Sequence, residues 1–451
     1  MYLFFKQLVI NIEKIIKMKR FIEDELLKWK QDKRRKPLIL RGARQVGKTY
    51  SIKQFGSRNY SDVAYCDLER NQSLHAVFSG DLDAKRIVSE LEVILGMKIS
   101  PERTLLVLDE IQACPRAIMS LRYFYEELPQ LHVMAAGSLL EFAMKDIAFP
   151  VGRVQFLAMY PLTFAEYLVA IGKQEAAEIV RGKPKQLSEA LHKLLLDELR
   201  RYFFIGGMPQ AVKAYMDTGS MKDAFSIQED IAETLKMDFA KYSPQVDKLC
   251  LQSVLASISK RVSQQLKYAS LAEDYSNPTI KKAFELLCLA KIAAPVRSID
   301  PSGLPLGASA SAKIFKAIMV DIGIMRYLCS MPVEVEFPTP DLLKIYKGAM
   351  AEQFAGQEML VSQNGSLYYW SRRAKSSSAE VDYVAVVDGA IVPVEIKSAV
   401  SGRLKSLHLM LNTYKNCPRG LVFSSDPRMS ITQDGLEYLP LYWAGSATRS
   451  G

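Results

Sequence analysis

The first 170 residues alternate short apolar runs with polar or amphipathic stretches. The strand-like stretches, most of them apolar, lie at 38–40, 62–67, 104–108, 132–136 and 154–157. Runs of this length, separated by helical patterns, are typical of buried strands in a parallel sheet whose faces are covered by helices. The pattern predicts an α/β domain over 36–170, preceded by a helical segment over 1–35.

The middle of the chain has two different patterns. A helical pattern over 175–240, interrupted by the turn Gly206-Gly207-Met208-Pro209, predicts an all-helical lid domain over 171–255. The stretch 268–287 then has the pattern of a short helix, a polar turn and a second helix that starts at Ser276 or Asn277. A strand-like run at 292–296 follows, so we predict a winged-helix-like domain over 256–335.

A hairpin pattern lies near the end of the chain, at 380–397. Asp388-Gly389 separates two runs of apolar and β-branched residues, and this dipeptide favours a two-residue turn. With these residues in the turn, Asp382 lies opposite Glu395. Most other positions are apolar, which predicts a strand pair that is covered on both faces.

The first apolar run leads into a phosphate-binding motif. Gly42-Ala43-Arg44-Gln45-Val46-Gly47-Lys48-Thr49 fits G-x-x-x-x-G-K-[ST]. Its glycines let backbone N–H groups point at phosphate oxygens, and the helix that begins around Tyr50 directs its positive end there. Lys48 reaches the outer phosphates, and the Thr49 hydroxyl takes a Mg²⁺ coordination position. The motif predicts binding of ATP and Mg²⁺ by residues 42–50.

Two carboxylates follow the apolar run at 104–108. They are Asp109 and Glu110, at the C-terminal end of a predicted buried strand, where parallel sheets bind their ligands. We expect Asp109 to hold Mg²⁺ through water. We expect Glu110 to orient or activate the attacking water.

Two further candidates adjoin the next strands. Ser138 either contacts the γ-phosphate or the attacking water, or caps the following helix, and both roles stay open. Arg153 either stabilises transition-state charge, in its own or a neighbouring subunit, or is an exposed loop arginine. We favour the catalytic role of Arg153.

The second helix of the winged-helix-like region begins with residues suited to DNA. These are Asn277, Thr279, Lys281 and Lys282, at the position from which such motifs contact the duplex. The alternative is a small packing domain with solvated lysines. The net charge of +10 permits nucleic-acid contact without establishing it. We favour DNA contact.

The open end of the predicted hairpin carries four charges on one face: Glu380, Asp382, Glu395 and Lys397. Carboxylates held side by side repel each other unless a cation joins them. A divalent metal satisfies them, and Lys397 then steadies an attacking water or developing phosphorane charge. The alternative is a pair of cross-strand salt bridges on a wet face. The surrounding apolar residues favour the metal.

Composition narrows the class of protein. The 451 residues are 49% hydrophobic and 24% charged, which fits a protein of two or three domains with buried cores. The six cysteines lie far apart without a C-x-x-C pair, and this predicts reduced thiols rather than a zinc site. No apolar run approaches the length of a membrane span, and Lys6 interrupts the apolar start. We predict a cytoplasmic protein that starts at Met1 or Met18.

Several motifs together resemble the prokaryotic AAA-type ATPases that carry an uncharacterised C-terminal domain. The resemblance covers nearly the whole chain and rests on the phosphate loop, Leu108-Asp109-Glu110-Ile111-Gln112, Gly137-Ser138-Leu139-Leu140, Gly152-Arg153 and Tyr160-Pro161-Leu162-Thr163-Phe164-Ala165-Glu166-Tyr167. It implies an AAA+-like core with Lys48 and Thr49 on nucleotide and magnesium. It also implies Asp109 and Glu110 as the Walker B pair, Ser138 as the first sensor and Arg153 as a finger.

The C-terminal hairpin resembles the PD-(D/E)XK nuclease superfamily, in which an Asp and a Glu-x-Lys lie on such a hairpin. That superfamily often adds a Glu from a preceding helix, and Glu352 matches it here. The resemblance implies an α/β nuclease-like domain over 336–451, with Asp382, Glu395 and Glu352 on a metal and Lys397 as a catalytic group. A following helix with His408, Asn412 and Lys415 flanks the site.

The sequence thus predicts an ATPase with a nuclease-like C-terminal domain that acts on or near DNA, in which ATP binding gates the C-terminal site. The alternative is an ATP-dependent switch or regulator whose C-terminal domain is inactive and binds DNA, another subunit or a protein partner. The predicted partners are ATP, DNA and further copies of the chain, without a membrane.

Overall fold

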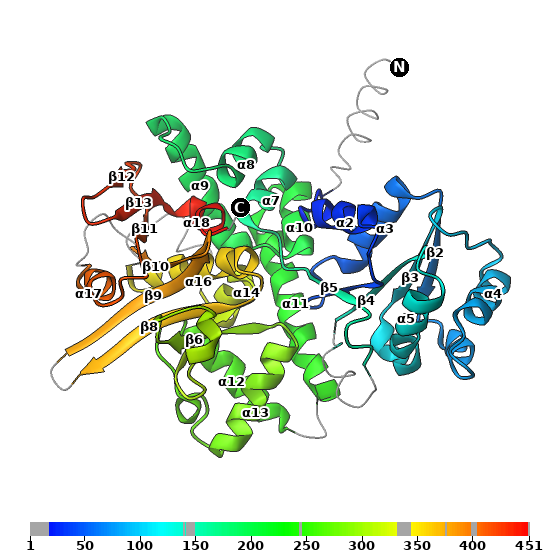
Figure 1. Cartoon of the computed structure of the whole chain (residues 1–451). Helices are drawn as coiled ribbons and strands as arrows, with labels where there is room; N and C mark the ends of the chain where they lie inside the picture. The colour runs from blue at the N-terminus through cyan, green and yellow to red at the C-terminus, as the bar shows by residue number, and fades with distance from the viewer. Residues whose placement is uncertain are drawn as a thin grey trace. The chain divides into compact units, whose positions relative to one another are not determined.

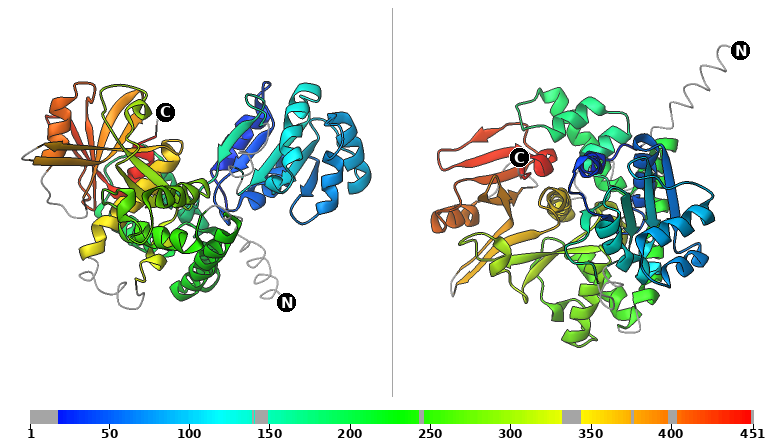
Figure 2. Two further views of the ribbon diagram at one scale, coloured as in Figure 1. Left: turned by 90° about the horizontal axis from the view of Figure 1, so that it is seen from below. Right: turned by 45° about the vertical axis from the view of Figure 1, so that its right-hand side comes forward.

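The computed structural model describes residues 18–138, 140, 149–242, 246–331, 344–374, 377–397 and 404–449. The chain divides into two compact units (Figures 1 and 2). The N-terminal unit consists of Arg20–Tyr160 with Leu289–Ile292, and the C-terminal unit consists of Met1–Lys19, Pro161–Cys288 and Ala293–Gly451. Among the described helices, none is long and apolar enough to cross a membrane.

A five-stranded sheet forms the centre of the N-terminal unit, in the order β2-β3-β4-β1-β5. All neighbouring pairs are parallel, which confirms the predicted α/β fold. The strands are β1 (Leu38–Arg41), β2 (Asp62–Asp67), β3 (Thr104–Asp109), β4 (His132–Gly137) and β5 (Gln155–Ala158). Every residue of β3 and β4 is buried, which explains their continuous apolar runs.

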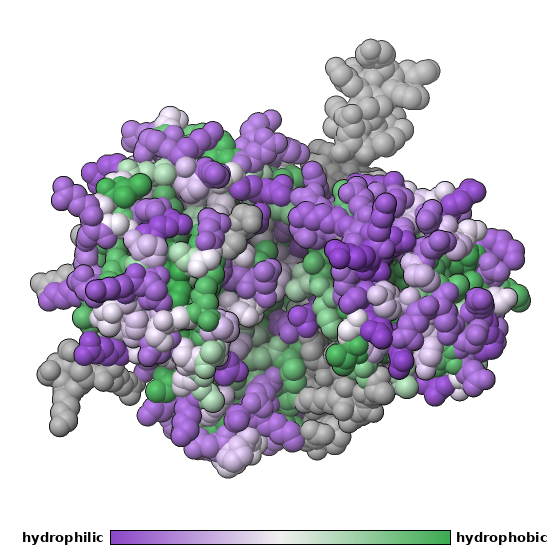
Figure 3. Space-filling view, in the orientation of Figure 1, coloured by the Kyte–Doolittle hydropathy of each residue, from purple (hydrophilic) through white to green (hydrophobic). Residues whose placement is uncertain are grey.

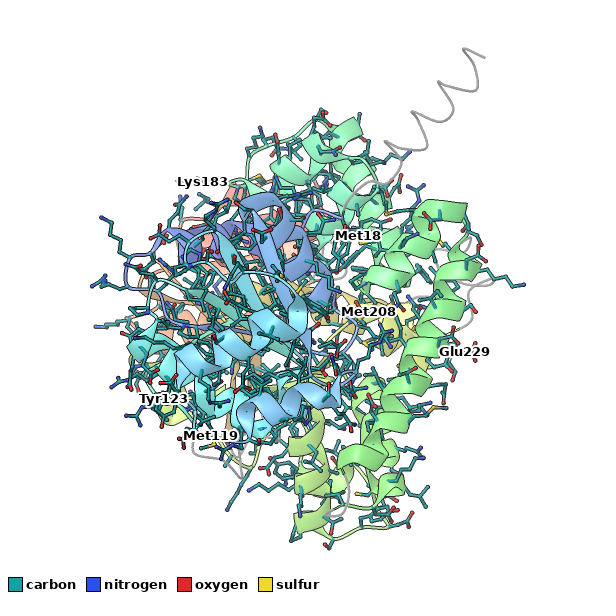
Figure 4. The ribbon with its side chains drawn as sticks, turned by 90° about the vertical axis from the view of Figure 1, so that its right-hand side faces the viewer. Met18, Met119, Tyr123, Lys183, Met208 and Glu229 are labelled. Carbon is teal, nitrogen blue, oxygen red and sulfur yellow. The ribbon has the colours of Figure 1, made fainter. Side chains whose placement is uncertain are left out.

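Amphipathic helices surround this sheet. They are α2 (Ile22–Gln31), α3 (Lys48–Asn59), α4 (Ala84–Leu95) and α5 (Pro115–Glu127), with the 3₁₀ turns η1 (Gln72–Phe78) and η2 (Ile111–Ala113). In α4 the buried Ile87 and Leu91 lie four residues apart, so they share one face of the helix. Figure 4 shows Met119 and Tyr123 at the same spacing along α5. Hydrophilic residues cover much of the visible face of this unit in Figure 3.

Helices also make up the first part of the C-terminal unit. They are α7 (Phe164–Ala170), α8 (Gln174–Arg181), α9 (Glu189–Ile205), α10 (Pro209–Thr218), α11 (Met221–Tyr242), α12 (Lys248–Lys260), α13 (Asn277–Leu289) and α14 (Ile322–Leu328). The predicted helical region over 171–255 therefore consists of α8 to α11 and part of α12. At the start of α7, Thr163 and Glu166 form a capping box.

An eight-stranded mixed sheet forms the rest of the C-terminal unit, in the order β12-β13-β11-β10-β9-β8-β6-β7. The strands are β6 (Ala293–Ile299), β7 (Phe315–Met319), β8 (Leu367–Ala374), β9 (Ser377–Val387), β10 (Ala390–Ile396), β11 (Gly420–Ser424), β12 (Ser430–Ile431) and β13 (Leu436–Pro440). The helices α16 (Lys344–Ser362) and α17 (Lys405–Thr413) pack against these strands, and α18 (Ala444–Ala447) packs against α16.

This sheet crosses a predicted domain boundary. The sequence predicts separate domains over 256–335 and 336–451, but β6 from the first pairs with β8 from the second. All three predicted domains beyond residue 170 contribute to the one C-terminal unit. The reason is a long-range strand pairing, which local patterns do not reveal.

The hairpin of β9 and β10 forms in the predicted register. Its pairing runs from the turn as far as Val394 opposite Tyr383. Both turn residues have positive φ, 49° at Asp388 and 79° at Gly389, as a turn of type I′ requires. The strand β10 is buried after its first residue, so the hairpin is covered on both faces as the sequence predicts.

The predicted winged-helix-like domain over 256–335 begins within α12. A single bridge pairs Leu266 with Phe315, and then come the 3₁₀ turn η4 (Tyr268–Ser270), α13 and the antiparallel strands β6 and β7. The short first helix of the prediction is thus a 3₁₀ turn, and the second helix begins at Asn277. The rings of Tyr268, Phe284 and Phe315 pack together, with centroids 4.7 to 6.1 Å apart.

The turn at Gly206-Gly207 lies in a buried polar cluster of the C-terminal unit. The Gly207 N–H donates to Asp321 Oδ2 at 2.6 Å, and the Gly207 carbonyl accepts from the Leu162 N–H at 2.7 Å. Tyr202 donates its hydroxyl to the Leu162 carbonyl. Burial raises the pKa of Asp321 to about 6, although the backbone N–H groups around it oppose this rise. The cluster thus joins the backbone at Leu162 to α9 and to the residue that precedes α14.

We expect Gly207→Ala to destabilise the protein. A Cβ at this position would lie 2.1 Å from the carbonyl oxygen of Leu162. Because that oxygen belongs to the backbone of the polar cluster, relief of the clash costs about 1–3 kcal/mol in the free energy of unfolding, measurable by urea denaturation. The control is Gly348→Ala in α16, where a Cβ meets open space and where alanine favours the helix by about 1 kcal/mol. Equal stability of the two variants would contradict the expectation.

Candidate functional site

The phosphate-binding motif forms the connection between β1 and α3, as the sequence predicts. A Cβ at Gly42 would lie 2.2 Å from the backbone oxygen of Met159, so only glycine fits there. Gly47 has φ 93° and ψ 23° and is the N-cap of α3, a conformation that glycine adopts without strain. The loop therefore turns directly into the positive end of α3.

Lys48 is buried, with 6% of its surface exposed. Its Nζ donates to the carbonyl oxygens of Gly42 and Ala43 at 3.0 and 2.7 Å. The ammonium group therefore lies against the curl of the loop, at the N-terminus of a helix. This combination of an ammonium and a helix N-terminus suits the phosphates of a nucleotide.

Thr49 and Asp109 are in contact, although Thr49 lies in α3 and Asp109 is the last residue of β3. Thr49 Oγ1 donates to Asp109 Oδ2 at 2.7 Å, and the Tyr65 hydroxyl donates to the same oxygen at 2.6 Å. Burial raises the pKa of Tyr65, and the hydrogen bond to Asp109 raises it further, so the phenol stays protonated. A hydroxyl beside a buried carboxylate provides the oxygen ligands that Mg²⁺ prefers. The residues here fit the predicted Mg²⁺ site.

Glu110 and Ser138 also lie together. Glu110 has a left-handed backbone, with φ 48° and ψ 44°. Its Oε2 accepts from Gln112 Nε2 at 2.6 Å and from Ser138 Oγ at 3.5 Å. The segment that Ser138 would cap lies largely outside the described residues.

The order of the strands brings these groups to one edge of the sheet. Arg41 at the end of β1 is level with Gly137 at the end of β4, and Leu108 in β3 is level with Ala135. The phosphate loop, the carboxylates and Ser138 follow these strand ends directly. This is the edge at which open parallel sheets bind ligands.

The remaining predicted nucleotide-binding residues shape the loop. Ala43 and Val46 are buried, and Gln45 has a positive φ of 63°. Arg44 is partly buried in the loop. Tyr50 is 43% exposed in the first turn of α3, and its hydroxyl accepts from Gln54 Nε2 at 2.8 Å.

Arg153 lies at the opposite edge of the sheet. Gln155, two residues later, is level with Leu38 at the start of β1, whereas the phosphate loop follows the end of that strand. Arg153 Nε donates to Glu126 Oε1 at 2.8 Å, and the arginine side chain is 46% exposed. The structure does not bring Arg153 to the nucleotide site of its own chain. A role in a neighbouring subunit stays a prediction.

Arg20 supports the loop, and the sequence patterns did not indicate it. Its Nη1 donates to the Val46 carbonyl at 2.8 Å and its Nη2 donates to the Tyr160 carbonyl at 2.7 Å. The side chain is buried at 4% exposure. The only signal in the sequence is an arginine just before α2, because both partners are backbone atoms far along the chain.

A second group of charged residues lies in the C-terminal unit. It consists of Lys316, Glu352, Glu380, Asp382, Glu395 and Lys397, which we call the carboxylate cluster. The sequence predicts all of these except Lys316. Asp382 Oδ2 accepts from the Ile396 N–H at 2.8 Å, and Lys397 Nζ donates to Glu395 Oε1 at 2.6 Å. The structure thus brings the predicted hairpin charges and the predicted helix residue Glu352 together.

Lys316 is the residue of this cluster that the sequence analysis missed. It extends from β7, and its Nζ lies 2.9 Å from Glu352 Oε1, 2.7 Å from Glu380 Oε1 and 3.6 Å from Asp382 Oδ1. Burial lowers the pKa of Lys316, but the carboxylates outweigh it and the net shift is upward. A lysine in an apolar strand pattern was the available signal, but its partners lie far along the chain.

Two carboxylates of the cluster, Glu352 and Glu395, have raised pKa values. Burial and the charge of Asp382 raise the pKa of Glu352 to about 8. The same two causes raise that of Glu395 to about 7. No set of three His, Cys, Asp or Glu side chains within the described part of the chain has an arrangement that could hold a metal ion. The predicted flanking residue His408 pairs instead with Asp434, at 2.9 Å.

The N-terminal unit has the fold and the loop geometry of a P-loop nucleotide-binding domain. Residues 34–168 match the family model described as an AAA domain. This part of the chain is therefore a P-loop domain of the AAA type. Residues 196–334 and 347–443 match two models described as domains of unknown function, DUF8612 and DUF4143.

Comparisons with known proteins add distant likenesses. No curated protein matches the chain. The Walker-type ATPase PABY2304 of Pyrococcus abyssi is 14% identical with a TM-score of 0.44, over 69% of this chain and 95% of that one. RuvB of Thermotoga maritima is 13% identical with a TM-score of 0.28, over 62% and 89%. Drosophila ORC bound to DNA is 10% identical with a TM-score of 0.26, over 69% and 94%.

We expect Arg20→Lys to weaken ATP binding. A lysine ammonium cannot donate in the planar fork with which Arg20 holds two carbonyl groups. Hydrogen bonds from charged groups contribute about 1.5–3 kcal/mol, so the affinity should fall about tenfold or more, as measured by titration with a fluorescent ATP analogue. Arg34→Lys, at an exposed residue, is the matched control. Equal affinities in the two variants would show that Arg20 does not shape the loop.

Proposed function

We propose that the protein is an ATPase that binds ATP with Mg²⁺ at the P-loop and hydrolyses it. The observation that carries this proposal is the hydrogen bond of 2.7 Å between Thr49 Oγ1 and Asp109 Oδ2. It supports a shared role of the two groups, because Mg²⁺ binds through hydroxyl and carboxylate oxygens in phosphate-transfer sites. Lys48, buried against the same loop, supplies the positive charge for the outer phosphates.

The proposed roles of the residues follow from their positions. The backbone of residues 42–50 and the N-terminus of α3 bind and orient the phosphates. Bound Mg²⁺ neutralises phosphate charge. Asp109 and Thr49 position that cation, and the Tyr65 hydroxyl holds the Asp109 carboxylate in place through the bond of 2.6 Å.

Glu110 is the proposed base. Its carboxylate is held between Gln112 and Ser138, so it has a fixed place at the edge of the sheet where the phosphates bind. From there it takes a proton from the attacking water or orients that water. Ser138 has the position of a group that senses the outer phosphate, and we propose that role for it. Arg153 would act across a homo-oligomer interface.

We expect Glu110→Gln to lose turnover while it retains ATP binding. The amide cannot accept the proton, and loss of a general base costs about 10²- to 10⁴-fold in rate. Lys48→Ala should lose binding as well. Phosphate release and nucleotide titration check both, with the exposed Glu102→Gln as control. Normal turnover in Glu110→Gln would assign the base to another residue.

We further infer that the segment from α12 to β7 contacts DNA. What supports this is the order of its elements, because α12, the bridged Leu266, η4, α13 and the β6–β7 pair follow one another as in a winged helix. Lys281 at the start of α13 is exposed, and its nearest carboxylate, Glu285, lies 3.8 Å away. A weak exposed pair of this kind leaves the lysine available to a phosphate. The alternative is a protein partner on the same surface.

The C-terminal unit has a nuclease-like arrangement in our proposal, because Asp382, Glu395, Lys397 and Glu352 gather as that superfamily requires. Lys316 Nζ lies among three carboxylates of the cluster, where a catalytic metal ion would bind, and this bears on whether the unit cuts DNA or only binds it. Location in the cytoplasm is also a proposal, and it is supported by six cysteines that are all free thiols.

We expect Lys281→Ala and Lys282→Ala each to weaken duplex DNA binding. Each lost phosphate contact should reduce the slope of log affinity against log salt by about 1. Fluorescence anisotropy at several salt concentrations measures this, and Lys222→Ala, exposed on α11, is the control. DNA binding that does not respond to salt, or to either substitution, would favour the protein-partner alternative.

A further inference from the structure

The carboxylate cluster contains an ammonium where the sequence predicts a divalent metal. Lys316 belongs to β7, the last strand of the eight-stranded sheet, and its side chain is only 2% exposed. A lysine is rarely buried to this extent unless carboxylates surround it. Its place inside the unit therefore has a specific electrostatic cause.

We propose that the Lys316 ammonium replaces the metal ion of the cluster, so that the C-terminal unit holds no divalent cation and does not cut DNA by metal-dependent hydrolysis. This inference deepens the proposal for the C-terminal unit. It does not depend on ATP hydrolysis at the P-loop.

The ammonium joins carboxylates from two elements. Glu352 comes from α16, while Glu380 and Asp382 come from one face of β9. Lys316 Nζ lies within 3.6 Å of all three, and it also lies 5.3 Å from the ring centroid of Tyr369. The ammonium is thus within ion-pair distance of the carboxylates that would otherwise converge on a metal.

Two other oxygens of the hairpin carboxylates already have protein donors. The Ile396 N–H occupies Asp382 Oδ2, and Lys397 occupies Glu395 Oε1. Glu395 Oε2 is buried without a hydrogen-bond partner, and Glu395 as a whole is 8% exposed. This buried, unpartnered oxygen points to a place where a cation could bind if Lys316 were absent.

The distances between Lys316 Nζ and the carboxylate oxygens are those of an ammonium and not those of a metal ion. Mg²⁺ binds oxygen at about 2.0–2.1 Å in octahedral geometry. The contacts of 2.7 and 2.9 Å from Lys316 to Glu380 and Glu352 are those of charge-assisted hydrogen bonds. Since both cations need the same oxygens, they exclude each other. Removal of Lys316 leaves carboxylates that repel one another, so the variant should acquire affinity for a divalent ion.

The test is Mn²⁺ titration of wild type, Lys316→Ala and Lys316→Arg by calorimetry, without nucleotide. We expect Lys316→Ala to bind one Mn²⁺ with a Kd of about 10⁻⁴ to 10⁻³ M, in the weak part of the range for oxygen-ligand sites. Wild type and Lys316→Arg, which keep a positive charge, should show no such binding. The exposed Lys313→Ala is a matched control and should behave as wild type.

A second substitution assigns the bound ion to the cluster. Asp382→Asn, added to Lys316→Ala, should abolish the gained Mn²⁺ binding, whereas Thr49→Val at the P-loop should leave it unchanged. If Lys316→Ala is unfolded without metal, Mn²⁺ should restore its thermal unfolding transition, and Asp382→Asn should prevent that rescue.

Two results would overturn the inference. One is Mn²⁺ binding, or metal-dependent nicking of plasmid DNA, by wild type that Asp382→Asn abolishes. The other is a folded Lys316→Ala protein that binds no Mn²⁺. ATP turnover, measured separately, reports on the P-loop and does not enter either result.

Discussion

The nucleotide site depends on the meeting of Thr49 and Asp109. Thr49 lies in α3, which follows β1, and Asp109 is the last residue of β3. The two can bond because β1 and β3 are parallel and only β4 lies between them. The parallel arrangement puts the ends of all three strands on one edge. The groups of the nucleotide site therefore come from the C-terminal ends of three strands and from the N-terminus of one helix. Two further contacts hold the backbone of the loop. Arg20 donates to the Val46 carbonyl, and the Met159 carbonyl lies against Gly42.

In the C-terminal unit, several buried polar side chains lie along a single helix, α16, and not at strand ends. In α16, Gln353 bonds to the backbone of Met319, Gln357 to the Ile322 N–H, and Glu358 to the Phe164 N–H. A buried polar group is costly unless it has a partner. Each of these side chains bonds to a backbone group at the first or last residue of another element, at the start of α7 and α14 and at the end of β7. Glu352 lies on the same helix, but its partner is the Lys316 ammonium of the carboxylate cluster and not a backbone group.

Local signals predicted local features well. Asp388-Gly389 gave the correct turn and register, because a type I′ turn depends on two adjacent residues. The phosphate loop was likewise readable from eight successive residues. The shared sheet of β6 and β8 was not, because this pairing joins segments on either side of a predicted domain boundary. Arg20 was missed for a similar reason, since a guanidinium that binds distant carbonyl groups leaves no pattern in the sequence.

For the carboxylate cluster, the sequence predicted the need for a cation but not which cation it is. The register of the hairpin established that acidic side chains would lie together, and electrostatics established that they need a cation. Neither argument identifies the cation, because a metal and an ammonium satisfy the same charges. Lys316 lies 36 residues from Glu352 in sequence, and only the folded chain brings its Nζ to 2.9 Å from that carboxylate. The acidic hairpin therefore specifies the need for positive charge, while the rest of the fold supplies the lysine that provides it.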